Sequence, residues 1–251
     1  MSEITRVLIP LESHSIETFQ TALSYAIQIC KKTKASSIIL LTHTKQQLKG
    51  TSLYQFLGDR AVKALSKGTV ALSGGIQLRH ETMQTLRWVS HPSVILAYYA
   101  ETRILDLADE QHNIVGVVAV PDLPGEADDW ATRWGTIVHG RGRVAPAALI
   151  EDGIVVRALE HLTQMINLST GLGHPRDKEQ ANEVLRILRA KGHMDPTPKI
   201  RSWAIRNGWR PKDADELEKL SLNIWKLKNK PSIAKFCNAH ERYDRWRRDE
   251  D

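Results

Sequence analysis

Short apolar runs alternate with longer amphipathic segments along the first 140 residues of the chain. Between the runs, apolar side chains recur at helical spacing, as at Phe19, Leu23 and Ile27, with Ser15 as the expected N-cap. The pattern predicts strands at 6–11, 36–44, 75–83, 93–100, 114–122 and 136–140, and helices at 15–34, 53–67, 102–112 and 125–135. Strands alternating with helices indicate a mostly parallel sheet covered on both faces, in a Rossmann-like α/β domain.

The strand signals stop near Val144, and the remaining periodicity is helical. Asp177, Asp195 and Asp213 are candidate N-caps, Pro196 suits a first helical position, and Gly192 and Gly208 suit helix ends. Helices are expected in the later part of 148–167 and at 177–192, 195–208, 213–229 and 232–248. We therefore predict two domains, an α/β domain at 1–145 and a basic helical domain at 146–251.

Positive charge is concentrated in the last third of the chain. The whole sequence carries a formal net charge of +6, whereas Arg186 to Arg248 contain 17 Lys plus Arg and 7 Asp plus Glu, a difference of +10. A basic segment of this kind favours an acidic partner, most often nucleic acid. A solvated, salt-tolerant surface is the alternative interpretation.

The sequence also bears on the compartment. No apolar run reaches the roughly 18 residues that a membrane helix requires. The first residues lack a basic start followed by an apolar stretch, so no secretory signal is expected. Cys30 and Cys237 are far apart and have no metal-ligand spacing, which is typical of reduced thiols. These features predict a cytoplasmic protein without a membrane partner.

Polar side chains follow several expected strands, where parallel sheets bind ligands. The ligand-binding candidates are Glu12, Ser13, His14, Ser15, Glu101 and Asp122, and Thr42-His43-Thr44 and Thr102-Arg103 lie at the same strand ends. A serine, a histidine and a carboxylate can meet at such an edge, although no nucleophile elbow marks the serine. Asp122, with Glu126, Asp128 and Asp129, suits either a divalent cation or the acidic first turn of a helix.

The common cofactor and metal signatures are absent from the sequence, which contains no GxGxxG, GxxxxGK[ST], HExxH or CxxC, so no cofactor is identified. The glycine loops at 73–75 and 169–173 suit ordinary turns better than anion sites. Trp130 and Trp134 are spaced i, i+4, which is typical of a core stripe; an aromatic wall for a base is the alternative.

The opening segment, VLIPLESHSIETFQTALSYAIQICKKTKASSIILL, resembles the universal-stress-protein and related adenine-nucleotide-binding α/β folds. The shared features are a strand, a short polar turn, a long helix and a second strand. The resemblance implies an acidic residue at the end of the first strand, a position that Glu12 fits. The later Gly-rich phosphate loop of that family is absent here, so the resemblance concerns the fold and not nucleotide binding.

The stretch IRSWAIRNGWRPKDADEL, from Ile200 to Leu217, combines an apolar helix face with a second, cationic face. Ile200, Trp203 and Ala204 share one face, which predicts that Trp203 packs in a small core. The cations are not needed for that packing. The candidate nucleic-acid-binding residues are Arg189, Lys191, Lys199, Arg201, Arg206, Arg210 and Lys212.

This stretch resembles helix–extended-loop–helix modules of the SAP and LEM kind, and its IRSWAIRNGW segment is similar to the C-terminal DNA-binding module of the xenogeneic-silencer nucleoid proteins. In the latter family an Arg-Gly-Arg in the turn enters the minor groove of AT-rich DNA. The turn here reads Arg210-Pro211-Lys212 and is followed by Asp213 and Asp215, while an Arg-Gly-Arg occurs only at 141–143. The resemblance therefore favours DNA over RNA as partner, and the changed turn argues against minor-groove reading.

Three hypotheses follow from the sequence. The favoured one is a two-domain nucleic-acid-binding protein, in which the α/β domain senses a ligand or docks a partner and the basic helices contact phosphates. The second is a nucleotide-processing enzyme with a Rossmann-like catalytic domain. The third is a scaffold subunit of a larger complex, of a defence system or mobile element for example, whose basic helices bind protein.

Overall fold

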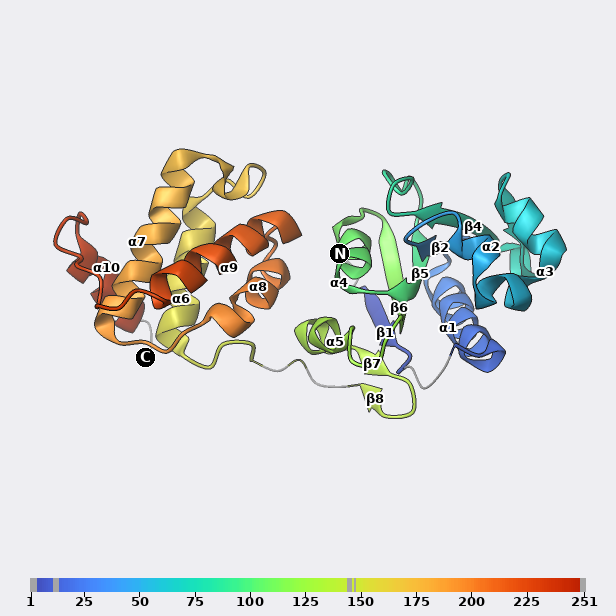
Figure 1. Cartoon of the computed structure of the whole chain (residues 1–251), viewed down its shortest axis with the longest axis horizontal. Helices are drawn as coiled ribbons and strands as arrows, with labels where there is room; N and C mark the ends of the chain where they lie inside the picture. Colours follow the sequence, from blue (N-terminus) through green and yellow to red (C-terminus); the bar gives the residue numbers. More distant parts are fainter. Residues whose placement is uncertain (1–3, 11–13, 144–145, 147, 249–251) are drawn as a thin grey trace. The chain divides into compact units, whose positions relative to one another are not determined.

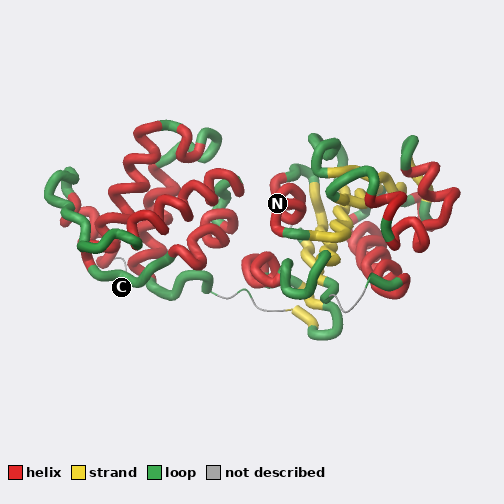
Figure 2. Tube along the Cα trace, in the orientation of Figure 1, coloured by secondary structure: helices red, strands yellow, loops and turns green. Residues whose placement is uncertain are grey.

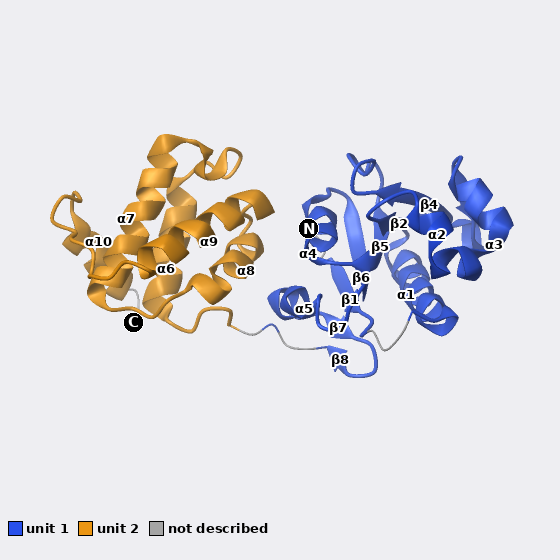
Figure 3. Cartoon of the chain, in the orientation of Figure 1, with its two compact units in different colours: residues 1–147 blue, residues 148–251 orange. Residues whose placement is uncertain are grey.

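The computed structural model of the chain describes residues 4–10, 14–143, 146 and 148–248. The chain divides into two compact units, residues 1–147 and residues 148–251 (Figure 3). The first unit is α/β and the second is helical, so the predicted fold class is confirmed: a mostly parallel, Rossmann-like sheet followed by helices. Among the described residues, no helix combines the length and apolar character needed to cross a bilayer.

The sheet of the first unit has the strand order β3-β4-β2-β5-β6-β1-β7-β8. Its six parallel strands are β1 (Thr5–Leu8), β2 (Ser37–Thr42), β4 (Gln77–Thr82), β5 (Ser93–Ala100), β6 (Ile114–Pro121) and β7 (Ile137–Val138) (Figure 1). Five of them lie inside segments that the apolar pattern predicts, and β1 overlaps the predicted strand 6–11 but begins one residue earlier, at Thr5. All eight residues of the central strand β5 are buried, which explains its continuous apolar sequence.

Two short antiparallel strands complete the sheet, and the sequence pattern did not predict them. The strand β3 (Thr69–Ala71) pairs with β4, and β8 (Gly142–Arg143) pairs with β7. Both are largely exposed, so neither has the buried apolar positions from which a strand is recognised.

Helices cover both faces of the sheet (Figure 2). One face packs on α1 (Ile16–Thr33), α2 (Gln47–Gly50) and α3 (Ser52–Leu65), and the other on α4 (Thr102–Glu110) and α5 (Asp128–Trp134). Side chains of β5 alternate between the two cores, with Leu96 and Tyr98 on the α1 side and Ile95 and Ala97 on the α4 side. This alternation fixes the strand register.

The second unit contains five α-helices among its described residues: α6 (Gly153–Met165), α7 (Pro175–Lys191), α8 (Thr197–Arg206), α9 (Pro211–Trp225) and α10 (Ala239–Arg248). Short 3-10 helices occur at η2 (Gly171–Gly173) here and at η1 (Ser73–Gly75) in the first unit. As predicted, Gly192 and Gly208 take positive φ angles where α7 and α8 end, and the Ser15 hydroxyl caps α1.

Several predicted helix starts are wrong. Asp177 and Asp213 are not N-caps but lie in the first turns of α7 and α9, because each helix begins two residues earlier at a proline. The helix predicted at 232–248 begins only at Ala239, after Asn238 has taken a left-handed φ of 52°. Asp195 is not the N-cap of α8 and Pro196 is not at its first position, because Pro196 is the N-cap and the helix begins at Thr197. Asp195 still accepts a hydrogen bond from the Thr197 N–H, at 2.9 Å.

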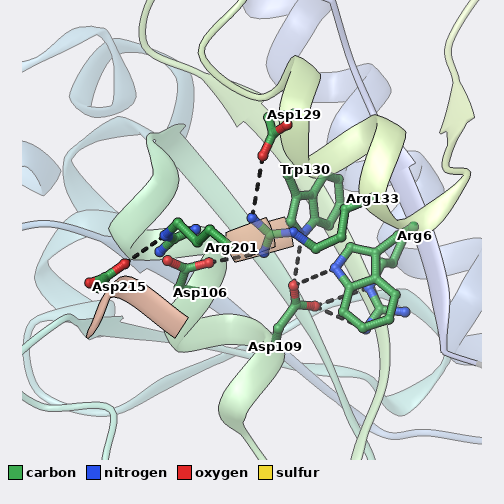
Figure 4. Close-up of polar contacts among 9 residues, drawn as sticks. Arg6, Asp106, Asp109, Asp129, Trp130, Arg133, Arg201 and Asp215 are labelled. Atoms are coloured by element: carbon green, nitrogen blue, oxygen red, sulfur yellow. Dashed lines mark hydrogen bonds and ion pairs between the residues drawn. The ribbon is translucent and has the colours of Figure 1, made fainter. Parts of the chain in front are cut away.

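Trp130 and Trp134 belong to the core, as the favoured interpretation of their spacing predicted. Their indole Nε1 atoms donate to the same oxygen of Asp109, at 2.9 and 2.7 Å. The other oxygen of Asp109 pairs with Arg6 at 2.9 Å (Figure 4), and the Arg6 guanidinium lies 3.8 Å from the Trp134 ring centroid. The two indoles thus donate hydrogen bonds to a buried ion pair, and these contacts join β1, α4 and α5.

Candidate functional site

The strand order creates a switch point between β2 and β5. From β2 the chain continues towards β4 through helices on one face, and from β5 it continues towards β6 through α4 on the other face. The loops at the carboxyl ends of these two strands therefore diverge and leave a crevice, the usual ligand position in such sheets. A similar divergence occurs between β1, followed by α1, and β6, followed by α5.

The fold brings several of the predicted ligand-binding residues together at this edge. His14 Nε2 lies 3.2 Å from the Asp122 carbonyl oxygen and 3.5 Å from its Oδ1. His43 Nδ1 lies 3.7 Å from Glu101 Oε1. Glu12 and Ser13 fall outside the described residues. Two histidine–carboxylate pairs, His14–Asp122 and His43–Glu101, therefore stand at the two switch points.

Ser15, by contrast, has a structural role. Its hydroxyl accepts a hydrogen bond from the Thr18 N–H at 3.2 Å and caps α1. The hydroxyl also lies 3.2 Å from Thr18 Oγ1. A serine held in this way does not complete a Ser-His-carboxylate triad, since His14 is paired with Asp122 and no hydrogen bond joins it to Ser15 among the described contacts.

Sequence reasoning missed Tyr98 and Tyr99, which connect the two pairs. The His14 ring lies 4.5 Å from the Tyr99 ring, centroid to centroid, and 5.6 Å from the Tyr98 ring. The Tyr99 carbonyl oxygen lies 3.1 Å from His43 Nε2, and its hydroxyl lies 2.8 Å from Ser52 Oγ. Both tyrosines look like ordinary members of an apolar strand in the sequence, so no local signal marks them.

This edge also carries unusual backbone and buried polar groups. Tyr99 has a φ of 59°, in the left-handed region that a bulky residue rarely adopts, beside an irregularity in the β5–β6 register. Within the described residues, the buried Tyr98 Oη and His14 Nδ1 make no hydrogen bond. Burial raises the pKa of Tyr98, so its hydroxyl stays protonated. Such groups are typical of a site that completes its hydrogen bonds with water or a ligand.

The acidic group after β6 is dispersed among different partners. Glu126 accepts from the Leu123 N–H at 3.0 Å, and Asp129 lies 3.6 Å from Arg133. Asp128 and Asp129 occupy the first turn of α5, as the macrodipole interpretation predicted. No group of three or more possible metal-ligating side chains gathers anywhere in the described ranges.

The structure separates the predicted nucleic-acid-binding residues into two groups. Arg189 and Lys191 lie at the C-terminal end of α7, where Arg189 Nη2 donates to the Leu227 carbonyl oxygen just after α9. Arg206, Arg210 and Lys212 surround the turn at the other end of α9. Because α9 has 15 residues, about 22 Å of helix separates the two groups.

Some of these cations have internal roles that the sequence did not reveal. Arg201 Nε lies 2.6 Å from Asp215 Oδ1 and so ties α8 to α9 (Figure 4). The Lys191 ammonium lies 4.7 Å from the Tyr243 ring centroid and 3.3 Å from His240 Nδ1. The prediction that no cation of this set takes part in packing is therefore wrong for Arg201. Lys199 lies exposed in the first turn of α8.

The α8–α9 turn lies beside the loop 167–174. The helix η2 packs against α9, and Gly171 approaches Asp213 so closely that a Cβ there would meet its carboxyl group at 2.0 Å. Exposed residues of the turn and loop therefore share one surface, which we call the turn surface: Ser169, Thr170, Gly173, His174, Arg176, Arg206, Asn207, Gly208, Arg210 and Lys212. Three of its four cations come from the predicted set.

The glycine loop does not offer a row of donors to an anion. The Gly171 N–H donates to the Asn167 carbonyl oxygen at 2.8 Å, and the Gly173 N–H donates to that of Thr170 at 3.1 Å. Asn167 Oδ1 accepts from the Ser169 N–H at 2.9 Å. The loop is therefore an ordinary internally bonded turn, and the positive potential of the turn surface comes from side chains and the α9 N-terminus.

Asp213 follows the basic turn in the sequence but is buried beneath the turn surface. Burial raises the pKa of its carboxyl group, and so does the neighbouring Glu216 charge, whereas Arg210 and Lys212 act to lower it. The side chain is buried against Gly171. The acidic residue that the sequence places directly after the basic turn is thus withdrawn from the exposed face.

Comparison with known families gives one match, and it covers the helical unit. Residues 151–247 match a family described as a domain of unknown function, DUF1889. The match includes α6 to α9 and nearly all of α10. No curated protein and no solved structure matches the chain significantly.

Proposed function

We propose that this protein binds nucleic acid through its helical unit. The observation that carries the proposal is the turn surface, where Arg206, Arg210 and Lys212 are all exposed around one helix N-terminus. Cations gathered on one face supply the sequence-independent attraction to a phosphate backbone. Trp203 and Trp209 are buried behind this face, so they support its shape rather than stack on bases.

The arrangement favours phosphate contact over base reading. Pro211 fixes the turn directly between Arg210 and Lys212 and begins α9, which leaves the two cations on a short, rigid segment. Asn207 donates one amide N–H to the Trp203 carbonyl oxygen at 2.8 Å, and its second amide N–H can bond a phosphate oxygen. DNA is the favoured partner because this turn resembles those of DNA-binding modules. A cytoplasmic location is consistent with binding to DNA.

In this proposal the α/β unit is a sensing or docking unit. His14, Asp122, His43 and Glu101 at the switch points would contact its ligand, with Tyr98 in the wall. The alternatives remain an enzyme acting at the same edge, or a scaffold whose basic helices bind an acidic protein. One measurement distinguishes the three functions. Only the favoured function requires the helical unit to bind nucleic acid with an affinity that depends on salt.

The test is fluorescence anisotropy of labelled duplex DNA, and of RNA of the same sequence, titrated with the full chain at several salt concentrations. If about four phosphates are neutralised, log K falls with log salt at a slope of about −3 to −4. The triple variant Arg206→Ala/Arg210→Ala/Lys212→Ala should weaken binding about tenfold or more and flatten that slope by roughly two to three.

Two matched triple variants serve as controls. Lys226→Ala/Lys228→Ala/Lys230→Ala removes equal charge from exposed positions after α9, and Lys31→Ala/Lys32→Ala/Lys67→Ala removes it from the α/β unit. Both should retain most of the affinity. If no binding occurs at low salt, or if all three variants weaken binding equally, the turn surface is not a nucleic-acid site and an acidic protein partner becomes the better explanation.

A further inference from the structure

A pocket lies at the carboxyl ends of β2 and β4, away from the switch-point residues described above. Its volume is about 520 Å³, within the range of small-molecule sites. The antiparallel strand β3 starts here, since Thr69 pairs with Arg79 in the middle of β4. The lining residues are Lys45, Gln46, Leu48, Lys49, Leu65, Ser66, Gly68, Thr69, Arg79, His80, Glu81 and Thr85. They come from α2, α3, β3, β4 and the loops beside them, so no sequence motif marks the pocket.

The lining has an excess of positive charge. Lys45, Lys49 and Arg79 are cationic, and Glu81 is the one carboxylate among the described lining residues. Glu81 Oε1 lies 3.3 Å from Arg79 Nη1, so this carboxylate neutralises one cation. The remaining formal charge of the lining is about +2 when His80 is neutral. This charge matches that of a phosphate monoester, which carries about −1.5 to −2 at neutral pH.

Arg79 has a donor that the protein does not satisfy. Its Nε is buried and makes no hydrogen bond within the described residues, although the same guanidinium pairs with Glu81 through Nη1. Buried guanidinium donors are normally bonded, most strongly to carboxylate or phosphate oxygens. An anionic oxygen in the pocket would provide the acceptor.

His80 adds a neutral acceptor to this cationic lining. Thr42 Oγ1 donates its only proton to the Thr44 carbonyl oxygen at 3.0 Å, so it accepts the 2.8 Å bond from His80 Nε2. Nδ1 of neutral His80 is then an acceptor. Burial lowers the pKa of His80 and the Lys45 charge lowers it further, whereas Glu81 raises it. A neutral imidazole suits a hydroxyl or amino donor on the organic part of a ligand.

We propose that this pocket binds a small phosphate monoester, with the phosphate held by Lys45, Lys49 and Arg79. Leu48 and Leu65 form an apolar wall for the organic part, and His80 accepts a hydrogen bond from it. The pocket belongs to the α/β unit, so the proposal is independent of nucleic-acid binding by the helical unit. The proposal assigns a ligand class to the α/β unit and places the ligand one strand away from the switch point between β2 and β5.

Isothermal titration calorimetry of the full chain tests the proposal. The probes are ribose 5-phosphate, glucose 6-phosphate and adenosine 5′-monophosphate, each paired with its dephosphorylated form, and inorganic phosphate alone. We expect at least one ester to bind, with its dephosphorylated form about tenfold weaker or more. Absence of heat for all three esters up to about 10 mM would overturn the proposal. Inorganic phosphate binding as tightly as the esters would also contradict it, because the organic part would then contribute nothing.

Variants locate the site. Lys45→Ala/Lys49→Ala should weaken binding of the ester about tenfold or more, and Arg79→Gln should weaken it in the same direction. The matched control Lys31→Ala/Lys32→Ala removes the same charge from exposed positions on α1 and should change affinity less than about twofold. Circular dichroism melting checks that each variant is folded. Equal losses in the control, or competition by duplex DNA for the same site, would overturn the assignment.

Discussion

Arg6 on β1 and Asp109 on α4 form an ion pair of 2.9 Å between groups that are 11% and 4% exposed. Asp109 also accepts hydrogen bonds from both indole N–H groups of α5, so its partners come from two other elements, β1 and α5. Burial raises the pKa of Asp109, and the Arg6 charge and these hydrogen bonds oppose that shift. The carboxylate is therefore tolerated only because its partners surround it.

We expect Asp109→Ala to destabilise the α/β unit by about 3–5 kcal/mol, because it leaves the Arg6 guanidinium buried without its counter-charge. Urea denaturation followed by circular dichroism measures this loss. The control is Asp59→Ala, which breaks an exposed 2.7 Å pair with Lys63 and should leave the free energy of unfolding nearly unchanged, because solvent screens such a pair. Equal effects of the two variants would contradict a special role for the buried pair.

The helical unit depends on the aromatic side chains behind its turn surface. Trp203 is 5% exposed, and we expect Trp203→Ala to cost roughly 3–5 kcal/mol through loss of a large core side chain. Trp88, which is 67% exposed, provides the matched control, and Trp88→Ala should change the free energy of unfolding by less than about 0.5 kcal/mol. Chemical denaturation monitored at 222 nm compares the two. A stable Trp203→Ala variant would mean that the turn does not depend on this core.

Asp152, the N-cap of α6, should make the free energy of unfolding depend on pH in the acid range. Partial burial acts to raise the pKa of its carboxyl group, but the hydrogen bonds from His193 and from the N–H groups of Val155 and Ile154 lower it overall. A lowered carboxyl pKa stabilises the folded state above the ordinary aspartate value of about 3.9, and this contribution is lost as the pH falls through the folded-state value.

Asp152→Ala should therefore cost about 1 kcal/mol at pH 7, the usual contribution of an N-cap, and the difference from the unaltered protein should shrink below about pH 4. Urea midpoints at pH 7, 5 and 3 measure it. A difference that stays constant over this range would show that the carboxylate charge does not contribute.

The two cysteines should differ in reactivity. Cys30 is fully buried, and burial raises the pKa of its thiol to about 11, so little thiolate forms near pH 8. Cys237 is exposed. We expect a thiol reagent such as DTNB to modify one cysteine rapidly in the folded protein and the second only after denaturation, and Cys237→Ser to abolish the rapid phase. Rapid modification of both thiols would contradict the packing of α1 against the sheet.

Sequence pattern predicted the elements whose side chains are buried in one continuous run or on one helix face. The strand β5 and the helix α1 are examples, because burial itself imposes the periodicity. The strand β3 escaped prediction because exposed edge residues need no apolar alternation. The start of α9 was misplaced because Pro211 initiates the helix before the acidic residue that resembles a cap.

The candidate sites were predicted less completely, for a geometric reason. His14 and Asp122 were both identified, since each precedes a helix in the segment after a strand, and parallel strands end at one edge. The ion pair of Arg201 with Asp215 depends on how two helices cross, which local pattern does not specify. The phosphate pocket joins Lys45, Arg79 and Leu65 from different parts of the chain, and only the strand order brings them together.

The two short strands at the ends of the sheet have a consequence for solubility. An unpaired strand edge is a template for pairing with another chain, and long, flat, apolar edges promote aggregation. Here the outermost strands are β3, with three residues, and β8, with two, and both run against the direction of their neighbours. A second molecule that approaches the described part of either edge meets a strand of only two or three residues, which offers few backbone hydrogen-bonding positions. The apolar parallel strands are thereby shielded from growth of the sheet into an intermolecular one.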